Sequence, residues 1–316
     1  MKNIYSNIIK FNSKNLIKII NILKKNGIIG LPTETVYGLA GNAYSSSAIK
    51  KIFKIKKRLK KNPLIVHYYN LNCAKKDVLL DGKFYKIYKK FSPGPITYIV
   101  KKKNKSKIKP LACGNLKTVG IRFPKNKIIR KLLKKLEFPL AMPSANKSSG
   151  VSPVKPLDVF EEFNNKIKVV DGGISKIGIE STVLNLVGKV CILRPGIITP
   201  KQIENVLKTK LKILTKQTII KSPGLLKKHY SPGIPMYINK NKCPNKYAFI
   251  TFGKKYPVTT NSFNLSRKSN LNEAAKNLYK FFRSVKKRGY KKIYVAKIPN
   301  TGVGIAINDR LKRASK

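Results

Sequence analysis

The sequence predicts an α/β protein of two domains joined by an extended linker, and three observations predict it. Short apolar runs, typical of strands, alternate with amphipathic patterns, typical of helices. The chain has 316 residues, more than one ordinary hydrophobic core supports. Residues 222–235 carry the turns SPG and SPGIP, which interrupt the alternation. We therefore predict a first domain at residues 1–210, a linker at residues 211–236 and a second domain at residues 237–316.

The first predicted elements follow from capping residues and periodicity. Ser13 is a suitable N-cap for a helix whose apolar residues recur on one face, and Gly27 is suited to end it. Residues 28–31 then form a short apolar strand. Ser45 or Ser46 opens a second helix, whose last turn carries two basic side chains.

The rest of the first domain alternates in the same way. A proline at the first helical position and the breaker SPGP after residue 91 set two of the helix ends. Helices are predicted at residues 84–91, 126–136 and 200–207. Strands are predicted at residues 64–67, 96–100, 118–123, 139–142, 167–170, and as a hairpin at 181–187 and 190–193.

The second domain has a shorter pattern. Residues 208–221 are polar and weakly patterned, so no element is predicted there. Strands are predicted at residues 247–252 and 293–298, and helices at residues 271–285 and 304–314. Alternating strands and helices indicate a small open α/β domain.

The charge is extreme, because 69 lysines and arginines face only 12 acidic residues, a net charge of +57. One interpretation is a broad surface for binding nucleic acid. The other is a surface that biased codon usage has shifted toward lysine. The even spread of lysine along the chain favours the second, since binding surfaces usually concentrate on one face. In both cases the protein should attract polyanions such as ATP and tRNA, and it offers few carboxylates to a metal.

Several classes of site and location are disfavoured. Only two histidines are present and no two cysteines are close in sequence, so a metal site or a disulfide framework is not expected. No apolar run is long enough for a transmembrane helix. The first ten residues lack the apolar core of a signal peptide, so we predict a cytoplasmic protein with no membrane contact.

Three short motifs carry the functional signal. They are PTETVYGL at residues 32–39, KxR at residues 56–58 with NPLIVH at residues 62–67, and PSAN at residues 143–146. Hydroxyls, cations and amide donors on loops at strand ends are what a nucleotide phosphate needs. No Ser-His-Asp or Cys-His pattern competes with them.

Each motif also has a plain structural interpretation. The first could be a tight turn closed by Gly38, and the third a flexible surface loop. Lys56 and Arg58 could be a solvated basic helix end, because residues i and i+2 do not share a helix face. His67 could be a half-buried histidine at a strand end. Taken one at a time, the motifs leave both interpretations open.

Together and in order, these motifs resemble the YrdC family of threonylcarbamoyl-AMP synthases. Further motifs in family order are SPGPIT at residues 92–97, TVGIR at 118–122, DGG at 171–173, STV at 181–183 and LRPG at 193–196. The tail resembles the two-domain members through SPGxxxxHYxP at residues 222–232 and NDRL at residues 308–311. Modest departures from the family pattern are Leu59, Ser92, Ser149 and Asn185.

The resemblance implies a fold and a reaction. The fold is a YrdC-like twisted open sheet with flanking helices and a deep basic cleft, followed by the linker and a small Rossmann-like domain. The enzyme is a nucleotidyltransferase that joins L-threonine, bicarbonate and ATP with Mg²⁺ into threonylcarbamoyl-AMP and pyrophosphate. A separate transferase complex then uses the product to modify tRNA adenosine.

The resemblance also implies roles for individual residues, with Lys56 and Arg58 as the catalytic cations and Tyr230 as part of a lid. The residues implied for threonine are Thr35, His67, Arg122, Met142 and Ser181. Those implied for ATP are Lys56, Arg58, Asn62, Thr118, Ser144, Asn146, Ser152, Arg194 and Tyr230. No metal ligand from the protein is implied.

Two other functions are weighed against this one. A non-catalytic protein of the same fold could use the basic surface to bind tRNA or double-stranded RNA. A carbamoyltransferase of hydrogenase maturation contains a similar domain, but it carries an acylphosphatase module and paired-cysteine zinc fingers before it. The matching region begins near residue 14 here and no cysteine pair is present, which disfavours that second alternative.

Overall fold

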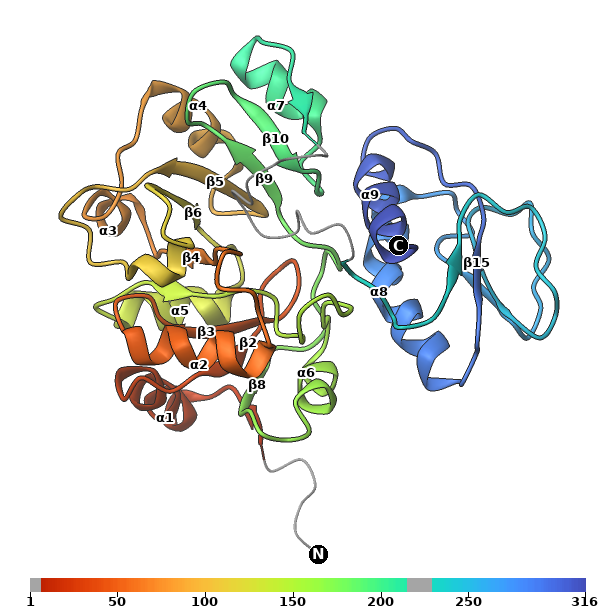
Figure 1. Cartoon of the computed structure of the whole chain (residues 1–316), viewed down its shortest axis with the longest axis horizontal. Coiled ribbons are helices and arrows are strands. Elements are labelled where there is room, and N and C mark those ends of the chain that lie inside the picture. The colour runs from red at the N-terminus through yellow and green to blue at the C-terminus, as the bar shows by residue number, and fades with distance from the viewer. Residues whose placement is uncertain (1–6, 215–228) are drawn as a thin grey trace, which may run out of the picture.

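The computed structural model describes residues 7–214 and 229–316, which form two mixed α/β units, each built on its own sheet (Figure 1). Along the described chain, the first sheet has the order β1-β8-β2-β3-β7-β4-β6-β5-β9-β10-β11. Its strands are β1 (Ile8–Lys10), β2 (Ile29–Leu31), β3 (Gly38–Asn42), β4 (Ile65–His67), β5 (Ile96–Lys101), β6 (Thr118–Arg122), β7 (Leu140–Ala141), β8 (Val169–Asp171), β9 (Thr182–Asn185), β10 (Cys191–Arg194) and β11 (Lys212–Ile213).

Helices flank this first sheet, and their ends follow from local sequence. The helices are α1 (Ser13–Lys24), α2 (Ser46–Lys56), α3 (Leu71–Lys75), α4 (Gly82–Phe91), α5 (Lys127–Lys135), α6 (Pro156–Glu162) and α7 (Pro200–Leu207), with a 3₁₀ turn at Pro110–Cys113. The predicted cap at Ser13 is wrong, because the side chain of Asn12 accepts the hydrogen bond from Asn15 N at 2.8 Å and Ser13 is already helical.

The centre of the first sheet brings chain segments that are far apart in sequence to one edge. β4 and β6 are parallel, and their register sets His67 beside Arg122 at their carboxyl ends. β7 runs antiparallel between β3 and β4, so the loop that follows it reaches the same edge. β9 is parallel to β5 and begins at Thr182, directly after Ser181. The sheet thereby gathers the ends of four strands around one point.

The second unit is a small parallel sheet with two long helices. Its described strands have the order β12-β15-β13-β14, and all the neighbours are parallel. The elements are β12 (Met236–Tyr237), β13 (Ala248–Thr251), β14 (Ser262–Asn264), α8 (Leu271–Lys287), β15 (Ile293–Val295) and α9 (Gly304–Ala314). Figure 1 shows α8 and α9 between this sheet and the first unit.

The two units share a packed boundary. Val36, Val151, Val154 and Ile179 of the first unit pack into the apolar core formed by α8, α9 and the second sheet. Ion pairs join the same boundary, since α8 sends Arg283 to Glu162 at 3.1 Å. The further ion pairs of α8 and α9 are Arg283–Asp158, Lys287–Glu161, Arg310–Glu180, Arg310–Asp309 and Arg313–Asp309.

The predicted α/β class and most of the predicted elements are confirmed. The sequence pattern did not indicate β3, since the run Gly-Leu-Ala-Gly-Asn holds two glycines and no β-branched residue. The short helices α3 and α6, and the short strands β1, β11, β12 and β14, were also not predicted. The predicted domain boundaries stay a prediction. Within the described ranges, no helix is both long and apolar enough to cross a lipid bilayer.

Candidate active site

A cleft of about 520 Å³, partly open to solvent, lies at the strand ends described above. Its walls come from the turn after β2, the ends of β4 and β6, the loop after β7, the start of β9, the end of β10 and residues 229–230. The lining residues are Thr33, Thr35, Val36, Tyr37, Gly38, Arg58, Ile65, His67, Arg122, Met142, Pro143, Ser144, Glu180, Ser181, Arg194, His229 and Tyr230.

The five residues implied for threonine all line this one cleft, although they come from five separate segments. They are Thr35, His67, Arg122, Met142 and Ser181. All five are buried, so their positions are fixed by packing.

The guanidinium of Arg122 is anchored through one of its nitrogens. Its Nη2 donates to Oε1 of Glu34 at 2.6 Å. The second carboxylate oxygen of Glu34 accepts from the backbone N–H groups of Lys125 at 3.0 Å and Asn126 at 3.2 Å. Burial opposes ionisation of Glu34, but the charge and hydrogen bond of Arg122 outweigh it and lower the pKa of this carboxyl. The buried Nε of Arg122 has no hydrogen-bond partner within the described chain.

His67 is a neutral side chain in the cleft. Its Nδ1 donates to the carbonyl oxygen of Ile65 at 3.2 Å, and the residue is only 2% exposed. Burial, reinforced by the positive charge of Arg122, lowers the pKa of His67 to about 3. The imidazole therefore contributes shape and hydrogen bonding, and no positive charge, at neutral pH.

Lys56 ends α2 with its side chain directed inward. Its Nζ donates to the carbonyl oxygen of Ser144 at 2.7 Å and to that of Asn146. The interpretation of Lys56 as a solvated helix end is therefore wrong, since the residue is 1% exposed. Lys57 ends the helix in the left-handed conformation, with a φ of 49°. The side chains of Lys56 and Arg58 therefore point in different directions.

The loop after β7 is held by its own side chains. Ser144 Oγ donates to Asn146 Oδ1 at 2.6 Å, and Asn146 Nδ2 donates to the carbonyl of Gly150 at 2.9 Å. The backbone N–H of Ser148 donates to the carbonyl of Lys56 at 2.9 Å. Ser149, which departs from the glycine frequent in the family, has a φ of 68°, a conformation that glycine adopts most easily.

Two arginines add positive charge to the cleft. Arg58 Nη2 donates to Asn62 Oδ1 at 2.6 Å and to the carbonyl of Pro63 at 2.8 Å, so Asn62 orients this guanidinium. Arg194 donates through Nη2 to Ser181 Oγ and through Nε to Ser181 O, both at 3.1 Å. Burial and the charge of Arg194 lower the pKa of Arg58, although a guanidinium remains charged at neutral pH.

The predicted ATP set is only partly gathered. Arg58, Ser144, Arg194 and Tyr230 line the cleft. Lys56, Asn62 and Asn146 stand behind it, bonded to lining residues. Neither Thr118 nor Ser152 lines the cleft, because Thr118 begins β6 at the end opposite Arg122 and Ser152 donates to Glu180 at 2.5 Å.

The described end of the linker covers the cleft. Tyr230 is 1% exposed and has a φ of 64°, and its hydroxyl has no partner in the described chain. The N–H of Ser231 donates to the carbonyl of Ser149 at 2.9 Å, which fastens this segment to the loop after β7. The SPG turn at residues 222–224 lies outside the described residues.

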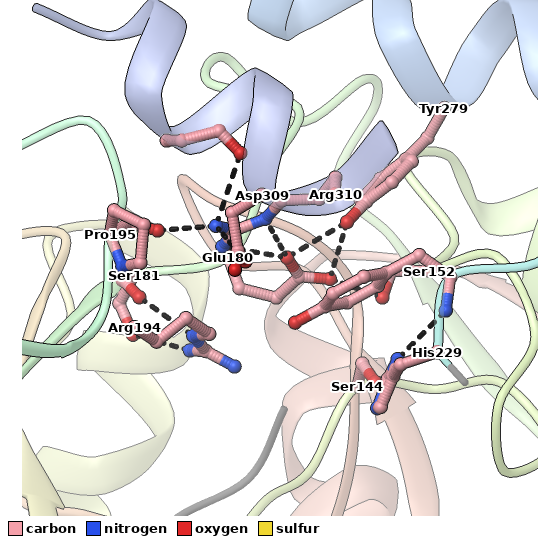
Figure 2. Close-up of polar contacts among 12 residues, drawn as sticks. Ser144, Ser152, Glu180, Ser181, Arg194, Pro195, His229, Tyr279, Asp309 and Arg310 are labelled. Carbon is pink, nitrogen blue, oxygen red and sulfur yellow. Dashed lines mark hydrogen bonds and ion pairs between the residues drawn. The ribbon is translucent and has the colours of Figure 1, made fainter. Parts of the chain in front are cut away.

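Sequence reasoning assigned no role to two polar residues of the cleft, Glu180 and His229. Glu180 is buried and accepts from Ser152, Tyr279 and Arg310 (Figure 2). His229 is buried and accepts the backbone N–H of Tyr230 at Nδ1, 2.9 Å away. Glu180 directly precedes Ser181, and His229 belongs to the motif SPGxxxxHYxP. An acidic residue beside Ser181, in a chain with only 12 acids, is a signal that could have found the first.

Comparison with known proteins gives matches over nearly the whole chain. Residues 21–196 match the family described as "Telomere recombination", which groups Sua5, YciO and YrdC. Residues 198–316 match "Threonylcarbamoyl-AMP synthase, C-terminal domain". The threonylcarbamoyl-AMP synthases of Pyrococcus abyssi and Bacillus subtilis are each 33% identical; both alignments cover 93% of this chain, and they cover 92% and 91% of the relatives. The crystal structure of P. abyssi Sua5 with L-threonine superposes with a TM-score of 0.90 at 29% identity, covering 98% of this chain and 97% of that one.

Proposed function

Because the chain belongs to the Sua5/YrdC family of threonylcarbamoyl-AMP synthases, we propose that this cleft joins L-threonine, bicarbonate and ATP into threonylcarbamoyl-AMP and pyrophosphate. The observation that carries the proposal is the meeting of two kinds of group in one cleft. An anchored arginine with an unpartnered Nε suits an amino-acid carboxylate, and a second cluster of cations suits a triphosphate.

The threonine end of the cleft is centred on Arg122. Glu34 holds one nitrogen of the guanidinium, so the free Nε remains available to the carboxylate of threonine. Thr35 and Ser181 offer hydroxyls, and neutral His67 offers a ring nitrogen without competing charge. Met142 supplies an apolar wall on which the threonine methyl group can pack.

The ATP end is centred on Lys56, Arg58 and Arg194. Arg58 and Arg194 would face the phosphates, while Lys56 and Asn146 shape the loop that carries Ser144. Asn62 would keep Arg58 oriented. Roles for Thr118 and Ser152 in ATP binding remain predictions, and the cleft contacts do not support them.

The chemistry requires no protein nucleophile. Bicarbonate yields CO₂ with loss of hydroxide, and the amine of threonine bonds to its carbon and loses a proton, so a carbamate forms and one water leaves. An oxygen of that carbamate then attacks the α-phosphorus of ATP as the bond to pyrophosphate breaks. The enzyme's contribution is to align the two anions and to neutralise charge as it develops. Tyr230, as a lid, would exclude water from the labile mixed anhydride.

Magnesium fits this site as a companion of ATP. The described chain groups no set of three or more His, Cys, Asp or Glu that could hold a metal. Glu180, which lines the cleft, is engaged by Arg310, and Glu34, which stands behind Arg122, is engaged by Arg122. We therefore infer that phosphate oxygens and water would hold Mg²⁺, which would supply charge neutralisation on the triphosphate.

Pyrophosphate release tests the proposal. It should require ATP, threonine and bicarbonate together, and release that persists without threonine would contradict it. Arg58→Ala should raise the KM for ATP by about tenfold or more while the KM for threonine changes far less. Lys57→Ala is the matched control, since Lys57 is exposed, carries the same charge and stands next to Arg58.

The product and the charge of the protein suggest partners. We propose that a tRNA-modifying transferase complex consumes threonylcarbamoyl-AMP in the cytoplasm. Contact with tRNA or double-stranded RNA has the support of the net charge of +57 alone. If RNA binding were the main function, purified protein would bind RNA with a steep salt dependence and would release no pyrophosphate.

A further inference from the structure

Arg310 of α9 belongs to the second unit, yet its side chain is fully buried against the wall of the cleft (Figure 2). It is part of the NDRL motif, to which the reaction itself assigns no role. Its Nη2 and Nε lie 3.2 and 3.3 Å from Oε2 of Glu180, and its Nη1 donates to the carbonyl oxygen of Pro195.

The two partners of Arg310 are sequence neighbours of two cleft residues that contact each other. Glu180 directly precedes Ser181, and Pro195 directly follows Arg194. Ser181 and Arg194 are joined by hydrogen bonds of 3.1 Å. The guanidinium of Arg310 therefore holds the chain neighbours of Ser181 and Arg194. We assign Ser181 to the threonine end of the cleft and Arg194 to the ATP end.

The same guanidinium also supports the lid. Its central carbon lies 5.4 Å from the centre of the Tyr230 ring, within the range of a cation–π contact. Tyr279 of α8 stacks on Tyr230 from 5.9 Å and donates to Glu180 at 2.9 Å. The lid and the wall of the cleft thus have a common support, which lies in the second unit.

We propose that Arg310 is a positioning residue of the synthase reaction, which stabilises the closed cleft by holding the Glu180–Ser181 wall and the Tyr230 lid at the same time. The proposal rests on the proposed function. It predicts that losing Arg310 lowers the fraction of molecules with a competent cleft. When only a fraction binds, the apparent affinity falls by that fraction for every ligand that needs the closed state.

The kinetic signature separates positioning from a merely structural role. Arg310→Met should raise the apparent KM values for ATP and for threonine by a common factor of about ten when the other substrate is kept well below its own KM, while kcat at saturation of both stays within about threefold of wild type. Arg310→Lys should recover part of the loss, because an ammonium can pair with Glu180 but cannot also reach Pro195 and Tyr230. In a Tyr230→Ala background, Arg310→Met should have a smaller effect, since one of its two supported elements is already absent.

Arg283→Met is the matched control. Arg283 also joins the two units, donating to Glu162 at 3.1 Å and to the carbonyl of Val151, but it does not line the cleft. It should lower thermal stability while both KM values stay within about twofold of wild type. Equal KM values in the two methionine variants, a rise in only one KM of Arg310→Met, or a loss of kcat alone would overturn the proposal.

A second variant and a binding measurement keep the proposal testable. If Arg310→Met does not fold, Arg310→Lys carries the same comparison. Calorimetric titration with threonine and with a non-hydrolysable ATP analogue repeats it without turnover. A wild-type protein that binds both ligands and releases no pyrophosphate would contradict the proposed function, while the affinities of the Arg310 variants would still decide this inference.

Discussion

The Nη2 atom of Arg122 lies 2.6 Å from Oε1 of Glu34, and both side chains are buried. Glu34 comes from the turn after β2 and Arg122 from the end of β6, so this ion pair joins two separate walls of the cleft. Its remaining carboxylate oxygen holds the backbone of residues 125–126. The pair therefore fixes both the direction of the guanidinium and the segment that follows it.

Glu34→Ala should remove that anchor. The threonine KM should rise by about tenfold, with a smaller effect on the ATP KM, because Arg122 loses its fixed orientation. The free energy of unfolding should fall by about 3 kcal/mol, since a buried arginine loses its partner. Steady-state kinetics and urea unfolding measure the two effects. Glu137→Ala, at an exposed acid, is the control, and equal threonine KM values in the two variants would contradict the role of Glu34.

Lys56 should take up a proton when ATP binds. Burial, helped by the charge of Arg58, lowers the pKa of this ammonium well below its usual value, whereas nearby phosphates would raise it again. In a pH series between about 8 and the usual lysine pKa of about 10.4, where phosphate groups are fully ionised, the binding enthalpy of an ATP analogue should depend on the ionisation enthalpy of the buffer. Lys56→Met should abolish that dependence and Lys57→Met should retain it. Identical proton uptake in wild type and Lys56→Met would rule this assignment out.

The two histidines should make the protein less stable in weak acid. Burial lowers the pKa of His67 and of His229 to about 3 each. Between that value and about 6.5 the unfolded chain binds protons that the folded chain does not, so stability is complete above about pH 6.5 and is lost as the pH falls. The slope should be about 1.4 kcal/mol per pH unit for each histidine.

Urea unfolding at several pH values between about 5 and 7 measures this slope, in a window where carboxylates contribute little. The chain holds no other histidine, so the double variant His67→Gln and His229→Gln should show a nearly flat profile. A wild-type profile that is already flat would show that one or both imidazoles are protonated in the folded protein.

Gly178→Ala should disturb the boundary between the two units. Gly178 has a φ of 85°, and a Cβ there would lie 2.5 Å from Cα of Lys276 and 2.8 Å from the carbonyl of Ala275, both in α8. Gly188→Ala is the matched control, because Gly188 also has a positive φ, of 69°, and has open space around it. The first variant should lose about 1–3 kcal/mol more of unfolding free energy than the second. Equal losses of unfolding free energy in chemical denaturation would mean that α8 shifts to accommodate the added Cβ without loss of stability.

Local pattern predicted those parts of the molecule that local interactions determine. The long helices α8 and α9 and the hairpin of β9 and β10 follow from periodicity, caps and turns, and their existence is confirmed. β3 has low strand propensity and exists because it pairs with β2 on one side and β7 on the other, a tertiary contact that no local pattern contains.

The same distinction applies to the site. The motifs located Arg122 and Arg58, whose partners Glu34 and Asn62 lie within motifs as well. Arg310 was noted only as part of a resemblance, because its partners stand 115 and 130 residues away along the chain. Lys56 continues the buried face of α2, three and four residues after Phe53 and Ile52, so helical spacing contains its direction, whereas the left-handed turn at Lys57 decides which way Arg58 points.

Five of the 12 acidic residues pair with arginine or lysine along α6, α8, α9 and the segment before β9, where the two units meet. On an open surface, exchanging an acid for lysine mainly adds to the net charge. At the boundary between the two units the same exchange would set like charges against each other, with the greatest cost at Asp158 and Glu180, which are buried. We therefore expect a mutational bias toward lysine to spare these buried carboxylates, because replacing them would reduce stability as well as add positive charge.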